Sequence, residues 1–378
     1  MVPIVISFLT ALLTVCYVSL VLYFRRGWIN LPWFHKSPAF VPKTSVSVLI
    51  AARNEEDKLD KTIRDILAQN YPRELLELII VDDHSTDRTA EIISSYSAEG
   101  VILIKLNEDQ PLNSYKKKAI TEAITISKGE LMVATDADCR MGPQWLANVV
   151  SCYQENNFKM ISSPVAYFEE KSVFEEMQTL EFLYLIGLGA STIGNKMPST
   201  CNGANLAYRK DVFFELKGFK GIDDLASGDD ELFLHKVASR YPDGIGFCKS
   251  REAIVYTHAK ATLGEFIQQR KRWASKSTKY KNKSVVVLGV SIWLFNLLIL
   301  VNGIVGFLDP QYWTLAIISL AGKFLVELAF LLPMCLFAHR IKLLWYQPLL
   351  TVLHIFYFVY IGVAGNSGKY NWKGRMVR

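Results

Sequence analysis

Long apolar stretches lie at both ends of this chain, and short apolar and polar segments alternate between them. Residues Val2 to Phe24 carry no charge, which is enough apolar chain to span a bilayer. A signal peptide is the alternative, but no charged region precedes the stretch and no small-residue cleavage site is clear after it. Three further apolar blocks are Val285–Leu308, Trp313–Ala338 and Leu343–Ala364. The pattern predicts one N-terminal and about three C-terminal transmembrane helices.

Between the apolar ends, short buried runs alternate with segments of helical pattern. The runs predict strands at Val46–Ala52, Leu76–Val81, Val101–Leu106 and Leu131–Ala134. The segments between and after them predict helices at Glu55–Gln69, Asp87–Tyr96, Tyr115–Ser127 and Gly142–Asn156. This alternation is typical of an α/β fold, with a Rossmann-like, mostly parallel sheet covered on both faces. About 100 residues of it form one nucleotide-binding half-domain.

The pattern changes after residue 157. Met160–Ala166 predicts one more strand, and Glu169–Ile193 predicts a helix. Ala261–Lys281 predicts a basic amphipathic surface helix, with Phe266, Trp273 and Tyr280 at heptad spacing. The predicted organisation is an anchor over 1–26, a linker over 27–43, a cytosolic domain over 44–260, an interface helix over 261–283, transmembrane helices over 284–366 and a basic tail over 367–378.

Charge decides the expected orientation. Basic residues cluster at Arg25 and Arg26, between Arg270 and Lys283, and around His339–Lys342, and the positive-inside rule makes these cytoplasmic. We therefore expect an integral protein of the cell (inner) membrane with its central domain in the cytoplasm. A third C-terminal crossing would leave the tail, which is also basic, outside. Either the tail is an exception, or one C-terminal segment lies in the interface instead of crossing.

Composition adds three points. The net charge of +6 favours attraction to membrane lipids over nucleic-acid binding. The six cysteines are scattered without a C-x-x-C pair, which is typical of reduced thiols. Lys323 and Glu327 are four residues apart inside an apolar block, so they lie on one helix face and can pair.

Acidic residues follow two predicted strands. Asp136 and Asp138 come directly after Leu131–Ala134, and Asp82 and Asp83 follow Leu76–Val81. Open parallel sheets bind ligands at these carboxyl ends. Paired carboxylates suit a divalent metal that carries a phosphate-bearing substrate, and Asp82 or Asp83 suits a base N–H or a ribose hydroxyl. The alternative for Asp136 and Asp138 is a solvated turn.

The loop after Asp83 also has a structural interpretation. Ser85 or Thr86 is expected to cap the next helix, and Asp87 suits its positive N-terminus. Lys116, Lys117 and Lys118 open another helix, where cations are unfavourable unless an anion such as a diphosphate is near. A solvated basic turn is the alternative for any one of them.

Two further motifs carry chemistry. Gly228-Asp229-Asp230 precedes a helix, so one carboxylate suits a general base while the other caps the helix. Gln269, Arg272 and Trp273 fall close to one helical face. Arg can bind a departing diphosphate through two hydrogen bonds, and the flat apolar ring of Trp can stack against a sugar. A membrane-surface helix with an interfacial Trp is the alternative for this motif.

Taken in order, Asp82-Asp83, Asp136-Ala137-Asp138, Gly228-Asp229-Asp230 and Gln269-x-x-Arg272-Trp273 resemble the motif series of membrane-bound, inverting family 2 glycosyltransferases with a GT-A fold. The resemblance covers about 44 to 281. Lys116 is similar to the Gly-Lys element of these enzymes, with Tyr115 in place of Gly. Asn202–Asn205, followed by Tyr208-Arg209-Lys210, resembles their acceptor-side segment.

The resemblance implies a role for each motif. Asp138 would bind Mg²⁺ or Mn²⁺, and Asp230 would be the base, with Asp229 as the alternate. The implied donor-binding residues are Ala51, Arg53, Glu55, Asp83, Lys116, Asp136, Gln269, Arg272 and Trp273. The implied donor is a nucleotide-diphospho-sugar, with UDP-sugars as the first expectation, and the acceptor is a glycan or lipid-linked molecule. Alternatives are a polyprenyl-phosphate glycosyltransferase, a processive polysaccharide synthase, or a non-catalytic nucleotide-sugar-binding scaffold.

Overall fold

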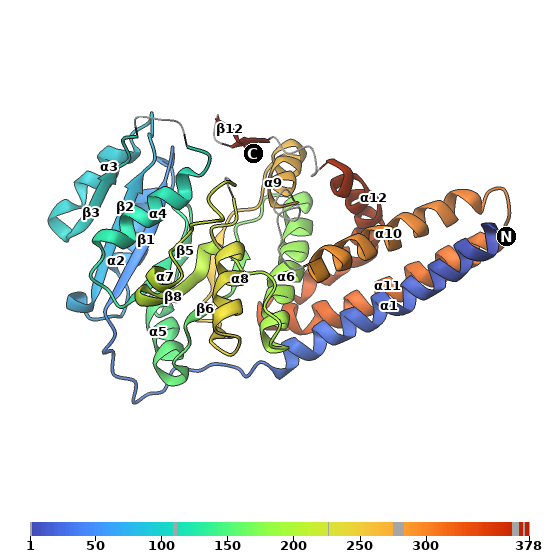
Figure 1. The fold of residues 1–378 in the computed structure, drawn as a ribbon, viewed down its shortest axis with the longest axis horizontal. Helices are drawn as coiled ribbons and strands as arrows, with labels where there is room; N and C mark the ends of the chain where they lie inside the picture. The colour runs from blue at the N-terminus through green and yellow to red at the C-terminus, as the bar shows by residue number, and fades with distance from the viewer. Residues whose placement is uncertain are drawn as a thin grey trace. The chain divides into compact units, whose positions relative to one another are not determined.

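The computed structural model describes residues 2–108, 112–225, 227–274, 283–364, 370–372 and 375–377. The chain forms two compact units, shown as ribbons in Figure 1. The sheet unit comprises Ile29–Glu170, Leu188–Ala259 and Asn371–Arg378. The helical unit comprises Met1–Trp28, Lys171–Gly187 and Lys260–Tyr370.

The main sheet of the sheet unit has seven strands in the order β3-β2-β1-β4-β8-β6-β9. They are β1 Val46–Ala52, β2 Leu76–Asp82, β3 Val101–Lys105, β4 Leu131–Ala134, β6 Met160–Ser162, β8 Leu206–Arg209 and β9 Ile245–Phe247. β1 pairs in parallel with β2 and β4, and β2 pairs in parallel with β3. β8 is antiparallel to both of its neighbours. The mostly parallel α/β sheet is confirmed, and the first four strands lie where the sequence predicts them.

Helices of the sheet unit flank this sheet, and α3 and α4 pack on β1, β2 and β3 (Figure 1). They are α2 Leu59–Leu67, α3 Thr89–Ser95, α4 Tyr115–Ile126, α5 Trp145–Asn156, α7 Lys210–Glu215 and α8 Glu231–Arg240. Short 3₁₀ turns are η1 Arg73–Leu75, η2 Ser97–Glu99 and η3 Gly203–Asn205. In α2, the buried residues Leu59, Thr62, Ile63 and Ile66 recur at helical spacing, so one face meets the core.

One predicted strand, Met160–Ala166, is wrong as a single element. It divides into β6 in the main sheet and β7 (Val165–Tyr167) in a three-stranded sheet with β5 (Arg140–Met141) and β10 (Val255–Thr257). Pro164 lies between the two pieces. Proline has no N–H to donate to a sheet ladder, which explains why the first strand ends there.

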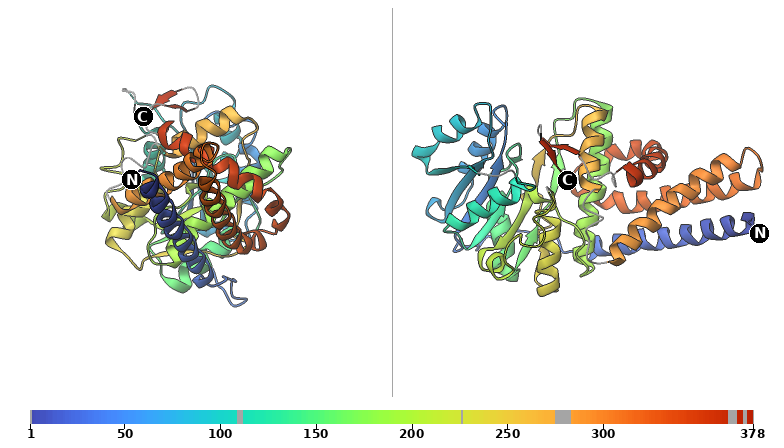
Figure 2. Two further views of the ribbon diagram at one scale, coloured as in Figure 1. Left: turned by 90° about the vertical axis from the view of Figure 1, so that its right-hand side faces the viewer. Right: turned by 45° about the horizontal axis from the view of Figure 1, so that its top comes forward.

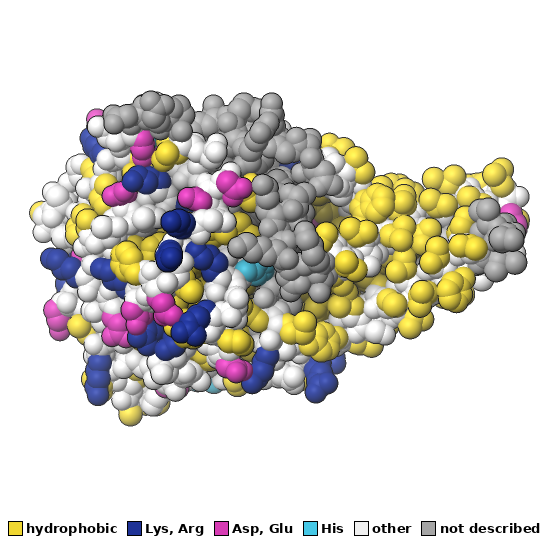
Figure 3. Space-filling view, viewed as in Figure 1, with side chains coloured by type: hydrophobic (Ala, Val, Ile, Leu, Met, Phe, Trp, Pro, Cys, Tyr) yellow, Lys and Arg dark blue, Asp and Glu magenta, His cyan; other side chains and the backbone are white. Residues whose placement is uncertain are grey.

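The helical unit contains long apolar helices. Its elements are α1 Val2–Asn30 as far as Trp28, α6 Val173–Gly194 as far as Gly187, α9 Leu263–Ala274, α10 Lys283–Val305, α11 Gln311–Phe337, η5 Ile341–Tyr346 and α12 Gln347–Ala364. Four segments are long and apolar enough to cross a membrane: Val5–Asn30, Val286–Val305, Gln311–Phe337 and Ile341–Ala364. One N-terminal and three C-terminal candidate spans are thus confirmed. Hydrophobic side chains cover α1, α10 and α11 in Figure 3.

The end of the chain lies partly outside the described residues. Tyr280 and the end of the predicted interface helix fall among residues 275–282, which are not described. Of the predicted basic tail, β11 (Tyr370–Trp372) and β12 (Arg375–Val377) are described and pair with each other.

Polar contacts cross the helical unit between its long helices. α1 and α11 lie side by side (Figures 1 and 2), joined by Thr14 and Ser319, whose hydroxyl oxygens are 2.9 Å apart. The expected ion pair of Lys323 with Glu327 is present and buried. The Tyr17 hydroxyl donates to Glu327 at 2.5 Å. The buried charges therefore satisfy one another, as membrane-embedded charges must.

Candidate active site

The carboxyl ends of β1, β2 and β4 meet at one edge of the main sheet. Ala52, the last residue of β1, pairs with Asp82, the last of β2, and Leu49 pairs with Ala134, the last of β4. The side chains that follow these strands therefore gather at that edge. Ala51, a predicted donor residue, lies within β1 and pairs with Val81.

Arg53 joins the loops that follow β1 and β2. Its guanidinium donates to the carbonyls of Asp83, at 2.8 Å, and His84, at 3.1 Å, and lies 3.9 Å from the Asp83 carboxylate. Asp83 is almost fully buried. The backbone N–H of Glu55 donates to Thr89 at 2.8 Å. Arg53, Glu55 and Asp83 thus belong to one connected pair of loops.

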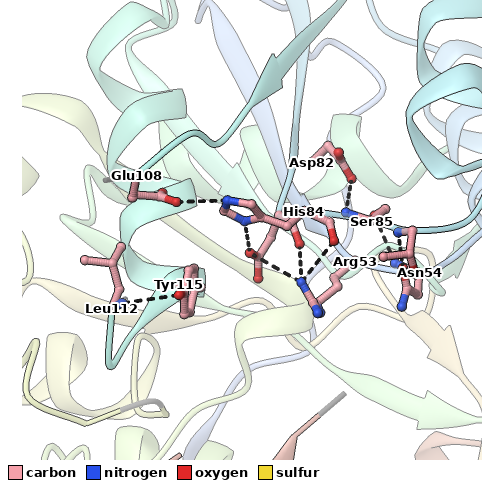
Figure 4. Close-up of polar contacts among 10 residues, drawn as sticks. Arg53, Asn54, Asp82, His84, Ser85, Glu108, Leu112 and Tyr115 are labelled. Atoms are coloured by element: carbon pink, nitrogen blue, oxygen red, sulfur yellow. Dashed lines mark hydrogen bonds and ion pairs between the residues drawn. The ribbon is translucent and has the colours of Figure 1, made fainter. Parts of the chain in front are cut away.

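His84 is a polar residue of this cluster that the sequence analysis does not single out (Figure 4). Its Nδ1 lies 3.0 Å from Asp83 Oδ1, and its Nε2 lies 3.2 Å from Glu108 Oε2. The Tyr115 ring meets the imidazole edge-on with centroids 5.8 Å apart. His84 has φ of 54°, so the strand-end loop turns sharply here. The only signal in the sequence is its place directly after Asp83.

Asp82, Ser85 and Asp87 have structural contacts in the same loop. The Asp82 carboxylate accepts from the Ser85 N–H at 3.3 Å. The Ser85 hydroxyl accepts from the Asn54 N–H, so it links two loops and does not cap the next helix as predicted. Asp87 accepts from the N–H of Thr89, the first residue of α3, so its expected place at the helix start is confirmed.

Lys116 joins two of the predicted motifs. Its ammonium lies 2.8 Å from Asp136 Oδ1 and 3.3 Å from Asp229 Oδ2. Burial acts to lower the pKa of Lys116, but the two carboxylates outweigh it and hold this pKa above its ordinary value. The lysine is therefore a fixed positive charge between residues that are more than 90 positions apart in the sequence.

The two lysines that follow have separate partners. Lys117 is buried and donates to the carbonyls of Ile222, Leu225 and Ser227 at 2.6, 2.7 and 2.9 Å. Burial lowers its pKa. Lys118 pairs with Glu122 on the exposed face of α4. The predicted anion-facing role therefore remains only with Lys116, and Lys117 holds the loop that leads to Asp229.

Asp138 is partly exposed, between the buried residues Ala137 and Cys139. Its carboxylate lies 3.7 Å from the Lys58 ammonium and its side chain is 25% exposed. The residues that the structure describes include no group of three metal-ligating side chains. One accessible carboxylate nevertheless fits Mg²⁺ or Mn²⁺, because such ions keep several waters and are held by one or two carboxylates plus substrate phosphates.

Asp230 begins α8 and contacts the acceptor-like segment. Its Oδ1 accepts from the Glu231 N–H at 2.7 Å, so the expected carboxylate cap of α8 is Asp230 itself. The expected division of the cap and the base between Asp230 and Asp229 is therefore not seen, because the residue that the motif assigns as the base is also the cap. Its Oδ2 accepts from the Gly203 N–H at 3.0 Å. A Cβ at position 203 would lie 3.3 Å from the Cβ of Asp230, so glycine permits this close approach. The side chain of Asn205 fixes the same segment to Trp145, Pro164 and Ala253.

Gln269, Arg272 and Trp273 lie on α9 in the helical unit, whereas the other predicted site residues lie in the sheet unit. Within the helical unit, the Trp273 ring stacks near Phe182 with centroids 6.2 Å apart. The guanidinium of Arg270, inside the same motif, lies 4.3 Å from the Trp273 ring and pairs with Glu181 at 2.9 Å. Arg270 is buried and positions this helix face, a role that the motif pattern does not reveal.

Comparisons with known proteins agree with this architecture. The chain is 26% identical over 337 residues to the probable glycosyltransferase YdaM of Bacillus subtilis (strain 168), covering 79% of this chain and 77% of that protein. It is 29% identical over 129 residues to the beta-monoglucosyldiacylglycerol synthase of Nostoc sp. (strain PCC 7120 / SAG 25.82 / UTEX 2576), covering 34% of this chain and 28% of that protein.

Similarity extends to a solved structure and to two family models. The mannosyltransferase PcManGT from Pyrobaculum calidifontis, in complex with GDP-Man and Mn²⁺, shares the fold over 96% of this chain and 98% of that chain, with a TM-score of 0.59 and 19% identity. The model "Glycosyl transferase family 2" matches residues 47–216. The model "Glycosyl transferase family group 2" matches residues 132–362, more than half of the chain. The chain, with its GT-A sheet and four candidate spans, belongs to the family 2 glycosyltransferases.

Proposed function

We propose that this glycosyltransferase is an inverting enzyme that moves a sugar from a nucleotide-diphospho-sugar, with UDP-sugars as the first choice, to a glycan or lipid-linked acceptor. The reaction takes place at the cytoplasmic face of the cell membrane. The observation that supports this most is the convergence of Asp136 and Asp229 on Lys116. Three separate motifs thereby form one charged cluster beside the strand ends that bind ligands in open sheets.

The donor would lie along this edge of the sheet. The buried Asp83 carboxylate, held beside Arg53, suits the N–H groups of a nucleotide base. Ala51 lies near the end of β1, and Glu55 lies in the loop that follows it. Lys116 brings a permanent positive charge that suits the diphosphate, and Asp136 suits the ribose or sugar hydroxyls.

Asp138 would hold the divalent metal, Mg²⁺ or Mn²⁺. When bound, such an ion supplies positive charge that stabilises the leaving diphosphate. Gln269, Arg272 and Trp273 are proposed to bind the donor at its diphosphate, toward the acceptor end, with Arg272 as the clamp on the departing diphosphate. The motif pattern supports these three assignments.

Asp230 is the proposed base. Its match to the second Asp of the Gly-Asp-Asp motif supports this assignment, and its carboxylate contacts the Gly203 N–H of the acceptor-like segment. Asp229, which pairs with Lys116, is the alternate. Asp230 would take the proton from the acceptor hydroxyl as that oxygen bonds to the anomeric carbon. The bond from this carbon to the diphosphate breaks in the same displacement, which inverts the configuration.

A donor panel tests the proposal. Membranes containing the protein would be incubated with radiolabelled UDP-, GDP- and dTDP-sugars, with and without Mn²⁺, and label would be measured in lipid extract and in polymer. We expect a metal-dependent signal from one nucleotide class. Membranes with Asp138→Ala serve as the matched control and should give no signal. If no donor labels either fraction above control, while equilibrium dialysis shows that the protein binds a nucleotide-sugar, the scaffold alternative is correct.

A further inference from the structure

The first half of α12 lies against α6, inside the helical unit. The Tyr346 hydroxyl, at the end of η5, donates to Glu176 of α6. Leu350 packs in one cluster with Leu180 and Leu183 of α6. The start of α12 is thus held to a helix that carries Glu175, Glu176 and Glu181.

The second half of α12 lies against α9. The rings of Tyr357 and Phe266 are 5.7 Å apart, and the Lys271 ammonium lies 5.6 Å from the Tyr360 ring. α9 has charged residues in both its first and last turns, which the hydrocarbon core of a bilayer does not accept at low cost. From Tyr346 to Tyr360 the segment is roughly 20 Å long. A helix that crossed the bilayer would meet such polar helices at one end only.

Contacts with α11 give the direction of α12. Gln347 donates to Glu327 at 3.3 Å, and the Lys323 ammonium lies 6.0 Å from the Phe358 ring. The two α12 residues are about 16 Å apart along their helix, whereas Glu327 and Lys323 are about 6 Å apart along α11. α12 therefore crosses α11 at a wide angle, unlike most transmembrane pairs, which cross at about 20–40°.

Contacts of α1 give the depth. The Arg25 side chain donates to the carbonyl of Ala329 at 3.1 Å, and Trp28 packs edge-on against Phe337. Glu327, which Gln347 contacts, is only two positions before Ala329. α12 thus lies near the level of Arg25, where the basic end of α1 leaves the hydrocarbon core.

We infer that η5 and α12 lie in the lipid headgroup region on the Arg25 side of the membrane, so the chain crosses the bilayer three times and its C-terminus stays on that side. The outward face of α12 is an apolar stripe of exposed residues: Leu349, Val352, Leu353, Phe356 and Val363. Trp345 in η5 is 87% exposed, close to Arg340 and Lys342. An apolar stripe with an interfacial Trp and basic neighbours matches a helix that lies in an anionic leaflet.

This arrangement also removes the conflict over the basic tail. With three crossings, the tail lies on the same side as Arg25 and Arg340, as the positive-inside rule requires. Asn371 and Trp372 group with the sheet unit, which begins at Ile29 directly after Trp28.

The decisive experiment maps the side on which the C-terminus lies. The otherwise unaltered chain would carry an epitope tag after Arg378, and intact cells and inverted membrane vesicles would be treated with protease. In a chain whose six native cysteines are replaced by serine, one cysteine at position 37, Ser37→Cys, would report the Arg25 side. One at position 308, Leu308→Cys, would report the opposite side through a membrane-impermeant maleimide; Leu308 is 88% exposed between α10 and α11. We expect the tag to be cleaved only in the inverted vesicles, and position 37 to be labelled in that same preparation. Cleavage in intact cells, together with labelling at position 308, would overturn the inference.

Trp345 gives a second readout of the same inference. Its emission, taken as the difference between wild type and Trp345→Phe, would be measured in vesicles whose lipid chains are brominated near the headgroup or near the chain end. We expect quenching by the shallow bromines and little by the deep ones. Stronger quenching by the deep bromines would contradict an interfacial position. Neither readout depends on transfer activity, so the inference about α12 is tested independently of the proposed function.

Discussion

Asp229 and Asp230 are adjacent, but their partners differ, and this difference predicts different mutant kinetics. Asp230→Asn should lower kcat by about 10²–10⁴-fold, because general-base catalysis supplies about that factor. Asp229→Asn should mainly raise the KM for the donor, since it removes one of the carboxylates that position Lys116. Steady-state rates in membranes check both.

Asp243→Asn is the matched control for these variants, because Asp243 forms an exposed pair with Lys196. Its kinetics should equal those of the wild type. If Asp230→Asn retains activity within about tenfold of wild type, Asp230 is not the base. That outcome would favour a phosphate acceptor, which needs no base.

Lys249 predicts a pH dependence of stability. Burial lowers its pKa from 10.5 to about 8, and its ammonium donates to the Leu31 carbonyl at 3.0 Å and lies 5.7 Å from the Trp33 ring. Between these two pH values the unfolded chain binds more protons than the folded chain, so stability rises as pH increases. Below pH about 8 the lysine is charged in both states and the dependence ends.

The measurement is thermal unfolding of wild type and Lys249→Met from pH 7 to 10.5. The free energy of unfolding of the wild type, measured relative to that of Lys249→Met, should increase as pH rises through this window, by at most about 1.4 kcal/mol per pH unit. A difference that stays constant with pH would show that Lys249 keeps its ordinary pKa in the folded protein.

Single residues show where sequence reasoning ends. Asp83 and Asp136 are predicted correctly at strand ends, because a short apolar run followed by a carboxylate fixes both the strand and its end. The contact of Lys116 with Asp229 is not predictable, because the loop between them is positioned by Lys117 through three backbone carbonyls. Every residue has a backbone carbonyl, so the residue types in a sequence do not show which carbonyls a buried lysine will bind. His84 is missed for a similar reason, since its partner Glu108 follows a different strand.

At the scale of elements, α4 and the loop before α8 are joined by Lys117. Lys117→Met should lower the free energy of unfolding by about 2–4 kcal/mol, because it leaves buried carbonyls without a donor. The matched variant is Lys118→Met, at the next position on the exposed face, which should change stability by less than about 0.5 kcal/mol. Chemical denaturation followed by tryptophan emission checks the pair. Equal effects of the two variants would show that Lys117 does not hold the loop before α8 to α4.

Elements with a strong period are predicted well, and short ones are not. β1 and β4 have the predicted bounds because continuous apolar runs of this length are typical of buried parallel strands. β8, β9 and β10 each span only three or four residues and alternate poorly, so their pattern gives no strand signal. The division at Pro164 is visible in the sequence, but only tertiary pairing places β6 and β7 in different sheets.

At the scale of the whole molecule, the proposed metal should be exchangeable and have no structural role. The described residues hold no cluster of three ligating side chains, so the donor's phosphates must complete the coordination. EDTA should abolish transfer, and excess Mn²⁺ or Mg²⁺ should restore it, with no change in the unfolding temperature without donor. Transfer rates and thermal unfolding check the two parts. A large fall in the unfolding temperature on chelation would show instead that the metal holds the fold together.

Lys116 also sets an order of events. Its ammonium balances the charge of Asp136 and Asp229, and the Lys58 ammonium lies 3.7 Å from Asp138, the proposed metal ligand. A divalent cation that arrives alone therefore meets carboxylates that already have cationic neighbours. A diphosphate offers the lysine a second anion and brings its own oxygens to the cation. Metal and donor should therefore bind as one complex, with each raising the affinity for the other, and free metal should saturate the enzyme only when the nucleotide-sugar is present.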